Sequence, residues 1–252
     1  MLSVKNINHK YQDKNGETDA IENISFNAEQ GKYISIVGPS GCGKSTLLSI
    51  ICGLVKQTSG EVYISGEKTD GISNKIGYML QKDNLLEWRT VLNNVLFGLE
   101  LQNKLDDESI AYSEKLLKTY GLYDFKEKYP SQLSGGMRQR VALIRTLSAR
   151  PEILLLDEAF SALDYQTRLS VTDDVYRIIK NENKTTIMVT HDIPEAISMS
   201  DEIIVLTERP AKINEIIKVD FGESAKTPLE KRKSPLFSKY FDAIWKELEG
   251  SV

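Results

Sequence analysis

Hydrophobic and polar positions follow two different periods along most of the chain. Short apolar runs rich in β-branched residues, such as Tyr33–Val37 and Thr186–Thr190, are typical of buried strands. Segments with apolar positions three or four residues apart, such as Gln166–Asn181, predict helices that bury one face. The same patterns predict strands at Glu61–Ile64, Lys75–Met79, Ile153–Leu156 and Glu202–Leu206, and a helix at Pro194–Ser200. Strands that alternate with helices predict an α/β fold with a mostly parallel central sheet.

Two regions depart from this alternation. Residues 2–7 and 21–26 are predicted strands joined by a polar loop, Asp13 to Asp19, and they predict an N-terminal antiparallel β subdomain. The stretch from about residue 84 to 145 is predicted to form a separate helical lobe. Its first helical segment starts near Thr90 and is interrupted near Asn103–Asp107, where a new helix begins.

The end of the chain predicts an amphipathic helix that docks back onto the preceding domain. Its apolar face consists of Phe237, Tyr240, Phe241, Ile244, Trp245 and Leu248. We therefore expect one domain over residues 1–220 and a C-terminal tail over 221–252. The basic run 231–233 is too short to indicate a lipid or nucleic-acid site, and it predicts solvated surface.

Length and composition are those of an ordinary globular protein. The chain has 252 residues, of which 40% are hydrophobic and 27% charged, with a net charge of −4. This acidic balance gives no reason to expect nucleic acid as a partner. The two cysteines, Cys42 and Cys52, lack metal-ligand spacing and are predicted to be reduced thiols of a cytosolic protein. We find no signal peptide and no apolar run long enough to cross a bilayer, so a membrane role would need a partner chain.

One glycine-rich turn carries very specific chemistry. Residues 38–45 match the phosphate-binding pattern G-x-x-x-x-G-K-[ST], and they lie between a predicted strand and a predicted helix. Backbone N–H groups and the helix N-terminus then point at a polyphosphate. Lys44 would reach the β- and γ-phosphates, and the Ser45 hydroxyl would ligate Mg²⁺. An ordinary glycine-rich turn is the alternative. The residues expected to contact nucleotide here are Gly38, Pro39, Ser40, Gly41, Cys42, Gly43, Lys44, Ser45 and Thr46.

Polar side chains follow directly on several predicted strands, and ligands of open α/β sheets bind at the carboxyl ends of strands. Three of them belong to Gln81, Asp157 and His191, and the backbone of Gly38 follows another strand in the same way, which predicts one composite site. Asp157 would reach the Mg²⁺, and Glu158 would orient or deprotonate the attacking water. His191 would hydrogen-bond the γ-phosphate, whereas His9 lacks such neighbours and is predicted to be structural. A strand that ends in Asp-Glu is often only a solvated edge, but the phosphate loop favours catalysis.

A second glycine motif, LSGGM at residues 133–137, begins a predicted helix with an apolar stripe. Ser134 is a good N-cap, so the motif can be simply a well-made helix start. It can also be a second anion site, in which Ser134 and the N–H groups of Gly135 and Gly136 face a γ-phosphate. The spacing alone does not decide between these interpretations.

LSGGM followed by Arg138-Gln139-Arg140 resembles the signature of the ATP-binding cassette (ABC) ATPases, and almost the whole chain follows the motif order of that family. The resemblance implies a P-loop NTPase fold with ATP and Mg²⁺ as cofactors. It implies that Tyr11 stacks on adenine and that Ser161–Asp164 forms the loop at the dimer interface, where Asp164 contacts nucleotide. The implied catalytic residues are Lys44, Gln81, Glu158 and His191, and the implied metal ligands are Ser45, Gln81 and Asp157.

In that family the signature of one subunit completes the ATP site of another. The chain has one phosphate loop and one signature, so the resemblance implies a working unit of two copies. Bound ATP would favour the closed dimer, and hydrolysis would release it.

Two stretches resemble the nitrate, sulfonate and taurine importer branch: Gln81–Val91, with Glu87 where that branch has proline, and Thr207–Ile213. They imply import of a small anionic solute through a separate permease at the cytoplasmic face, fed by an extracytoplasmic solute-binding protein. Leu85, Leu86 and Trp88 then form an interaction surface for the permease, or else pack within the helical lobe.

Other ABC proteins remain as alternatives. An exporter's ATPase subunit stays open because the hydrolytic motifs are shared. A DNA-repair or chromosome-structuring ATPase would carry a long coiled coil between its phosphate loop and signature, and residues 45–133 show no sustained heptads. A translation factor would carry two cassettes, and only one is present. The sequence does not encode the solute, which the permease and binding protein select.

Overall fold

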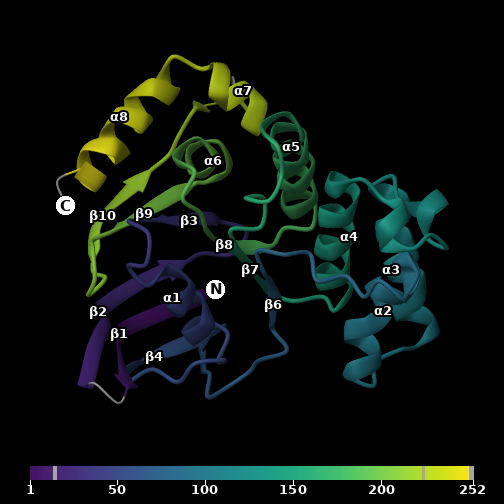
Figure 1. Cartoon of the computed structure of the whole chain (residues 1–252), viewed down its shortest axis with the longest axis horizontal. Helices are drawn as coiled ribbons and strands as arrows, with labels where there is room; N and C mark the ends of the chain where they lie inside the picture. The colour runs from purple at the N-terminus through teal and green to yellow at the C-terminus, as the bar shows by residue number, and fades with distance from the viewer. Residues whose placement is uncertain (14–15, 223–224, 250–252) are drawn as a thin grey trace.

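Two sheets form the framework on which the helices pack (Figure 1). The structure is a computed structural model that describes residues 1–13, 16–222 and 225–249. The larger sheet has the strand order β10-β9-β3-β8-β7-β6, and β10 is its antiparallel edge strand. Its strands are β3 (Tyr33–Val37), β6 (Ile76–Met79), β7 (Ile153–Asp157), β8 (Thr185–Val189), β9 (Glu202–Leu206) and β10 (Ile213–Lys218). The predicted α/β fold with a mostly parallel sheet is confirmed.

The central strands are apolar on both faces because both faces are covered. Alternate residues of β7 belong to different cores: Ile153 and Leu155 pack with α1 (Lys44–Ile51), whereas Leu154 and Leu156 pack with the helical lobe. β3 and β8 are buried along their whole length. Such continuous apolar runs are the pattern expected of parallel strands between two helical layers.

The smaller sheet is antiparallel, with the strand order β2-β1-β4-β5. Its strands are β1 (Leu2–Asp13), β2 (Gly16–Ala28), β4 (Ser59–Ile64) and β5 (Glu67–Lys68). The expected antiparallel subdomain is present, but the polar loop predicted over Asp13 to Asp19 is wrong for Asp13 and for residues 16–19, and residues 14–15 lie outside the described residues. Residues 16–19 belong to β2, where Thr18 pairs with Tyr11 and Glu17 with Gln12. One face of an antiparallel ribbon can lie in water, so polar side chains did not mark the end of the strand.

Three helices, which lie between β6 and β7 in the chain, form a lobe to one side of the large sheet: α2 (Val91–Leu101), α3 (Asp107–Thr119) and α4 (Gly135–Ser148). Short 3-10 helices, Tyr123–Phe125 and Pro130–Gln132, join α3 to α4. Asp106 caps α3 by accepting a hydrogen bond from the Ser109 backbone N–H at 2.8 Å, and Ser109 returns a capping bond. The predicted interruption near Asn103–Asp107 is confirmed, because this capping box starts a new helix there.

The remaining helices are α5 (Tyr165–Asn181), α6 (Ile193–Met199), α7 (Pro228–Lys233) and α8 (Leu236–Glu249). α8 lies against α6 and the strands β9 and β10, as expected for a docked helix. Ile244 is fully buried, but Trp245 is 48% exposed and stacks on Phe241 instead of entering the core. No helix in the described ranges is long and apolar enough to span a membrane.

The prediction of solvated surface for 231–233 is wrong for Lys231. This side chain is 7% exposed, and its ammonium lies 5.0 Å from the centre of the Tyr176 ring. α7 packs across α5, so one side of a short basic helix becomes interior. Burial lowers the pKa of Lys231 to about 8. The pattern of the sequence also gave no prediction for β10 or α7.

Candidate nucleotide-binding and hydrolysis site

The phosphate loop connects β3 to α1, as predicted. The Lys44 side chain is only 7% exposed, and its ammonium donates to the carbonyl oxygens of Gly38 at 2.8 Å and Pro39 at 2.9 Å. Gly43 has φ of 129°, and a Cβ there would lie 3.1 Å from the Ala20 carbonyl oxygen. Glycine is therefore required at this position, where the loop turns into the helix against β2.

Oxygen ligands suited to Mg²⁺ meet beside this loop. The Ser45 hydroxyl donates to Asp157 Oδ1 at 2.9 Å, and the Tyr78 hydroxyl donates to Asp157 Oδ2 at 3.0 Å. Burial, together with the neighbouring Asp157 charge, raises the pKa of Tyr78, so this hydroxyl keeps its proton at neutral pH. A hydroxyl and a carboxylate are hard oxygen donors of the kind that Mg²⁺ prefers, so the residues present fit the ion.

Two of the residues predicted to be catalytic contact the carboxylate of a third. Glu158 Oε2 lies 3.2 Å from His191 Nδ1 and accepts a hydrogen bond from Gln81 Nε2 at 3.4 Å. Gln81 Nε2 also donates to the Ser161 hydroxyl at 3.2 Å. Glu158 has φ of 46°, an uncommon value for a residue other than glycine, and its N–H donates to the Val189 carbonyl oxygen. The ends of β6, β7 and β8 thus bring these side chains to one edge of the sheet.

Tyr11 lies next to the helix that follows the phosphate loop. Its hydroxyl and that of Thr46 are 2.9 Å apart, and its ring is 42% exposed. His9 is 7% exposed and meets the Tyr11 ring edge-on, with ring centroids 4.6 Å apart. The exposed Tyr11 ring leaves an aromatic surface beside the loop, and the buried His9 supports it, in keeping with a structural role.

The loop 161–164 leads into α5 and is held by an arginine that sequence reasoning missed. Asp164 caps α5 by accepting from the Thr167 N–H at 3.1 Å, and bonds from Thr167 lower its pKa. Arg168 donates to the carbonyl oxygens of Leu163 and Ser161 at 2.9 and 3.3 Å, and to Asp192 at 3.1 Å. It therefore joins this loop to the segment after His191. Hydrogen bonds to backbone carbonyls leave no pattern in a sequence.

Arg209 is a second residue whose contact the sequence did not predict. Its guanidinium donates to the Gly41 carbonyl oxygen at 2.9 Å, so the turn between β9 and β10 supports the phosphate loop. The sequence marked Arg209 only as part of a stretch that resembles one branch of a family. Burial raises the pKa of the neighbouring Cys42 thiol, which keeps that cysteine protonated. Cys42 and Cys52 are both free thiols, as predicted.

Ser134, Gly135 and Gly136 begin α4, away from the site just described. The Ser134 hydroxyl caps the helix by accepting from the Met137 N–H at 3.4 Å, which confirms the predicted N-cap. A Cβ on Gly136 would lie 2.8 Å from Val171 Cγ2, so glycine lets α4 approach α5 closely. Within the described part of the chain, no hydrogen bond joins Ser134 to residues 38–45.

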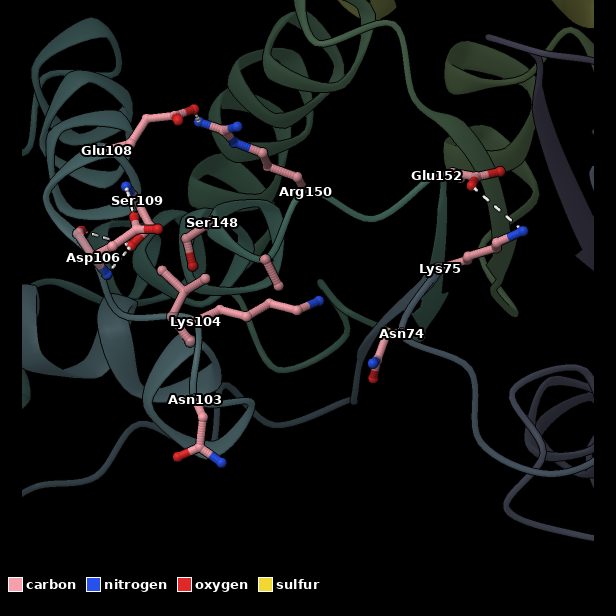
Figure 2. A pocket seen from close by; sticks show the side chains of 12 residues that line it. Asn74, Lys75, Asn103, Lys104, Asp106, Glu108, Ser109, Ser148, Arg150 and Glu152 are labelled. Carbon is pink, nitrogen blue, oxygen red and sulfur yellow. Dashed lines mark hydrogen bonds and ion pairs between the residues drawn. The ribbon is translucent and has the colours of Figure 1, made fainter.

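A cavity of about 540 Å³ lies at the other end of the strands, where β6 and β7 begin (Figure 2). Two ion pairs lie among its lining residues. Arg150 contacts Glu108 at 2.8 Å, and Lys75 lies 4.0 Å from Glu152. Because the predicted site residues follow the last residues of the strands, whereas this cavity lies where the strands begin, the cavity is not part of the site.

The protein has the features of a P-loop nucleoside triphosphatase: the central sheet, the phosphate loop and the Ser45–Asp157 pair. Residues 21–161 match the ABC transporter family. The uncharacterized ABC transporter ATP-binding protein YtlC of Bacillus subtilis is 47% identical over 249 residues, 99% of this chain and 96% of the relative. The nitrate import ATP-binding protein NrtD of Synechocystis sp. is 36% identical over 253 residues, 99% of this chain and 95% of the relative.

Among solved structures, the dimeric post-hydrolysis state of the ATP-binding cassette MJ0796, bound to ADP and Pi, has a TM-score of 0.73 and 33% identity. The match covers 88% of this chain and 100% of that one. The chain belongs to the ABC transporter family, and it is an ATP-binding ATPase of that family. The resemblance to this family is thereby confirmed.

Proposed function

We propose that the chain powers the import of a small anionic solute, of the nitrate or sulfonate class, by hydrolysing ATP as one of two copies docked on a permease at the cytoplasmic face. The observation that carries the hydrolytic part is the convergence of Gln81, Glu158 and His191 beside the Ser45–Asp157 pair. The import part rests on the similarity to NrtD and on the stretches Gln81–Val91 and Thr207–Ile213. An extracytoplasmic binding protein would deliver the solute.

Each site residue has a role that its position supports. Lys44 binds the β- and γ-phosphates, while the N–H groups of the loop bind their oxygens. Ser45 and Asp157, with Gln81, would hold Mg²⁺, which when bound neutralises charge on the phosphates. Glu158 orients the attacking water and can accept its proton, and the 3.2 Å contact with His191 holds that carboxylate in place. Tyr11 stacks on the adenine.

Two copies of the chain are needed to complete one site. Ser134, Gly135 and Gly136 lie at the positive end of the 14-residue helix α4, where an anion is favoured, yet Ser134 makes no bond to its own phosphate loop. We therefore infer that they contact the γ-phosphate bound by the other copy, and that Asp164 approaches the same nucleotide. The similarity to a dimeric cassette supports this arrangement.

The permease contact is assigned to the segment around Trp88, which is 75% exposed. The expectation that Leu85 belongs to this surface is wrong, because Leu85 is 6% exposed and packs in the core of the helical lobe. Leu86 is only partly buried. A large exposed aromatic side chain is the kind of anchor that protein interfaces use.

Replacing Glu158 tests the hydrolytic assignment. Glu158→Gln keeps the shape of the side chain but removes the carboxylate, so turnover should fall by roughly a hundredfold or more while ATP still binds. Phosphate release measures turnover, and gel filtration with ATP should show an accumulated dimer. Glu208→Gln, an exposed change outside the site, serves as control. Near-normal turnover in Glu158→Gln would contradict the assignment.

A mixing experiment tests the shared site. Ser134→Arg should abolish turnover and leave ATP binding by the single chain intact, because the change affects only the other copy's nucleotide. Lys44→Ala should lose ATP binding. Mixing the two proteins should restore a fraction of the activity, since one mixed interface combines an intact loop with an intact signature. Absence of activity at every mixing ratio would count against two separately competent sites.

Growth tests the solute class. A strain whose own copy carries Glu158→Gln is grown on nitrate, on taurine and on an alkanesulfonate as the sole nitrogen or sulfur source. Loss of growth on one of these, restored by the unaltered chain, supports import of that solute. Normal growth on all of them would remove the solute class from the proposal.

A further inference from the structure

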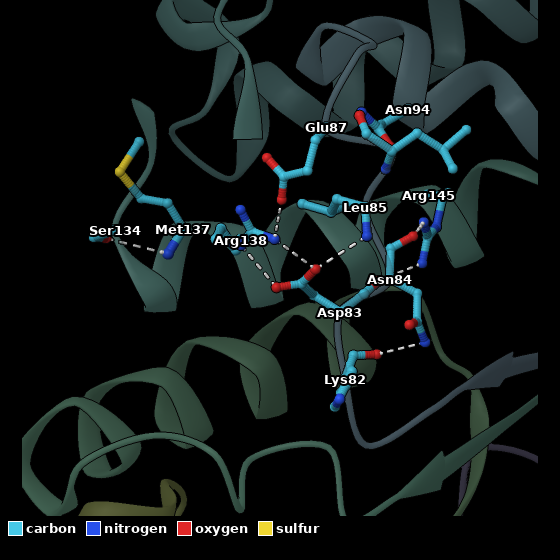
Figure 3. A network of polar contacts seen from close by, with 11 residues as sticks. Lys82, Asp83, Asn84, Leu85, Glu87, Asn94, Ser134, Met137, Arg138 and Arg145 are labelled. Atoms are coloured by element: carbon cyan, nitrogen blue, oxygen red, sulfur yellow. Dashed lines mark hydrogen bonds and ion pairs between the residues drawn. The ribbon is translucent and has the colours of Figure 1, made fainter. Parts of the chain in front are cut away.

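An arginine on the signature helix holds the segment that follows Gln81 (Figure 3). Arg138 Nε donates to Asp83 Oδ2 at 2.8 Å, and its Nη2 donates to Asp83 Oδ1 at 3.0 Å. The same Nη2 donates to Glu87 at 2.8 Å. A planar guanidinium that faces both oxygens of one carboxylate fixes orientation as well as distance. The two side chains of the main pair are 23% and 18% exposed, so solvent screens them only in part.

Further contacts bind the backbone of this segment to two helices. Arg145, two turns along α4 from Arg138, donates to the carbonyl oxygens of Asp83 at 2.6 Å and Asn84 at 2.7 Å. From α2, the Asn94 amide accepts from the Leu86 N–H at 2.7 Å and donates to its carbonyl oxygen at 3.1 Å. The segment after Gln81 is thus held to α2 and α4 as part of the helical lobe.

The contact joins side chains of opposite charge. Glu87 stands where the resembling importer branch has proline, and here its carboxylate gives Arg138 a second acidic partner.

The Arg138–Asp83 pair lies close to two predicted functional motifs. Gln81 lies two residues before Asp83 and contacts Glu158, whereas Ser134 lies one helical turn before Arg138. We propose that Arg138 is a positioning residue that, through Asp83 and Glu87, fixes Gln81 relative to α4. It thereby sets where Gln81 stands beside Glu158 and where Ser134 stands in the neighbouring site. This inference rests on the proposed shared site.

The test compares this pair with a matched ion pair that does not touch the segment. Lys126 contacts Glu114 at 2.7 Å elsewhere in the lobe, with side chains 25% and 31% exposed. Arg138→Gln and Asp83→Asn should each lower kcat about tenfold. The double variant should be no slower than Arg138→Gln alone, because both changes remove the Arg138–Asp83 pair. Glu114→Gln should leave kcat unchanged. Binding of a fluorescent ATP analogue to the single chain should be unaltered in all of them.

Trp88 supplies a readout that does not depend on activity. The chain has two tryptophans, so Trp245→Phe leaves Trp88 as the only one. In this background, the fluorescence anisotropy of Trp88 should decay with a larger nanosecond component in Arg138→Gln and Asp83→Asn than in the unaltered chain. Glu114→Gln should leave this decay unchanged. Arg138→Lys, which keeps the charge without the planar fork, should fall between Arg138→Gln and the unaltered chain in both readouts.

The outcomes separate this inference from the proposed function. If Glu158→Gln measured alongside hydrolyses ATP normally, the proposed function fails. If Glu158→Gln is inactive while Arg138→Gln keeps full kcat, only the coupling through Arg138 is overturned. It is also overturned if the losses in Arg138→Gln and Asp83→Asn add in the double variant, or if Glu114→Gln reproduces them, since Arg138 is then only a structural brace.

Discussion

Glu195 makes the stability of the protein depend on pH near neutrality. Its side chain on α6 is 3% exposed; Oε2 accepts from the Thr190 hydroxyl at 2.5 Å, and Oε1 has no hydrogen-bond partner in the described structure. Burial raises the pKa of Glu195 from 4.5 to about 7. Other ionisable groups facing it are Tyr33 on β3, Asp192 before α6, Arg168 on α5 and Arg232 on α7.

The sign and size of the effect follow from linkage. The folded pKa lies above the unfolded one, so between pH 4.5 and about 7 the folded chain binds more protons, and its stability falls as the pH rises. A shift of one unit is worth about 1.4 kcal/mol, which gives a loss of roughly 2 to 3 kcal/mol between pH 5 and pH 8. Glu195→Gln has no proton to exchange, so its stability relative to the unaltered chain should rise by that amount over this range.

Urea unfolding of both proteins at several pH values from 5 to 8 measures this difference. Glu208→Gln is the control, since its exposed carboxylate should give a curve parallel to that of the unaltered chain. Parallel curves for Glu195→Gln and the unaltered chain would refute the reasoning, because they would mean that the buried carboxylate titrates at an ordinary pKa. A constant offset from the lost Thr190 contact would not affect the test, which uses only the slope.

Three further predictions concern packing and docking. Ile244→Ala should lower the free energy of unfolding by about 2 to 5 kcal/mol, because this fully buried side chain holds α8; urea unfolding measures it. Gly77→Ala should lower it by about 1 to 3 kcal/mol, since the added Cβ would lie 2.5 Å from Thr146 Cγ2; a stability equal to that of the unaltered chain would contradict this. Trp88→Ala, 75% exposed, should change stability by less than about 0.5 kcal/mol and weaken co-purification with the permease.

The sequence predicted the inner strands of the large sheet well because they are buried on both faces, and it missed the exposed edge strand β10. Runs such as Ile153–Leu156 leave no polar alternation, and turn residues bound them. The same geometry explains why Gln81, Asp157 and His191 could be expected to meet. Parallel strands end at one edge, so a polar residue after each strand is brought close to the others without any further information.

Other elements depended on partners that lie far away in the sequence. Lys231 is interior only because α7 packs on α5, and Leu85 is interior only because the segment after Gln81 folds onto the lobe. Residues 16–19 are polar and still form a strand, because β1 supplies their hydrogen-bond partners. In each case the local pattern was outweighed by tertiary contacts, which a single sequence does not display.

The contacts of three arginines in and near the site also could not be predicted from the local sequence. Motif residues follow strands and helix starts, so their chemistry can be inferred from local order. Arg138, Arg168 and Arg209 instead fix one loop relative to another, and two of them do so through backbone carbonyls, which every residue type provides. Catalysis by positioned groups is sensitive to displacements of about 1 Å, so these bridges set how precisely the motif residues meet. Lysine carries all its donors on one nitrogen, whereas Arg168 uses Nη1 for Asp192 and Nη2 for the loop carbonyls, so its planar fork can join two separate segments.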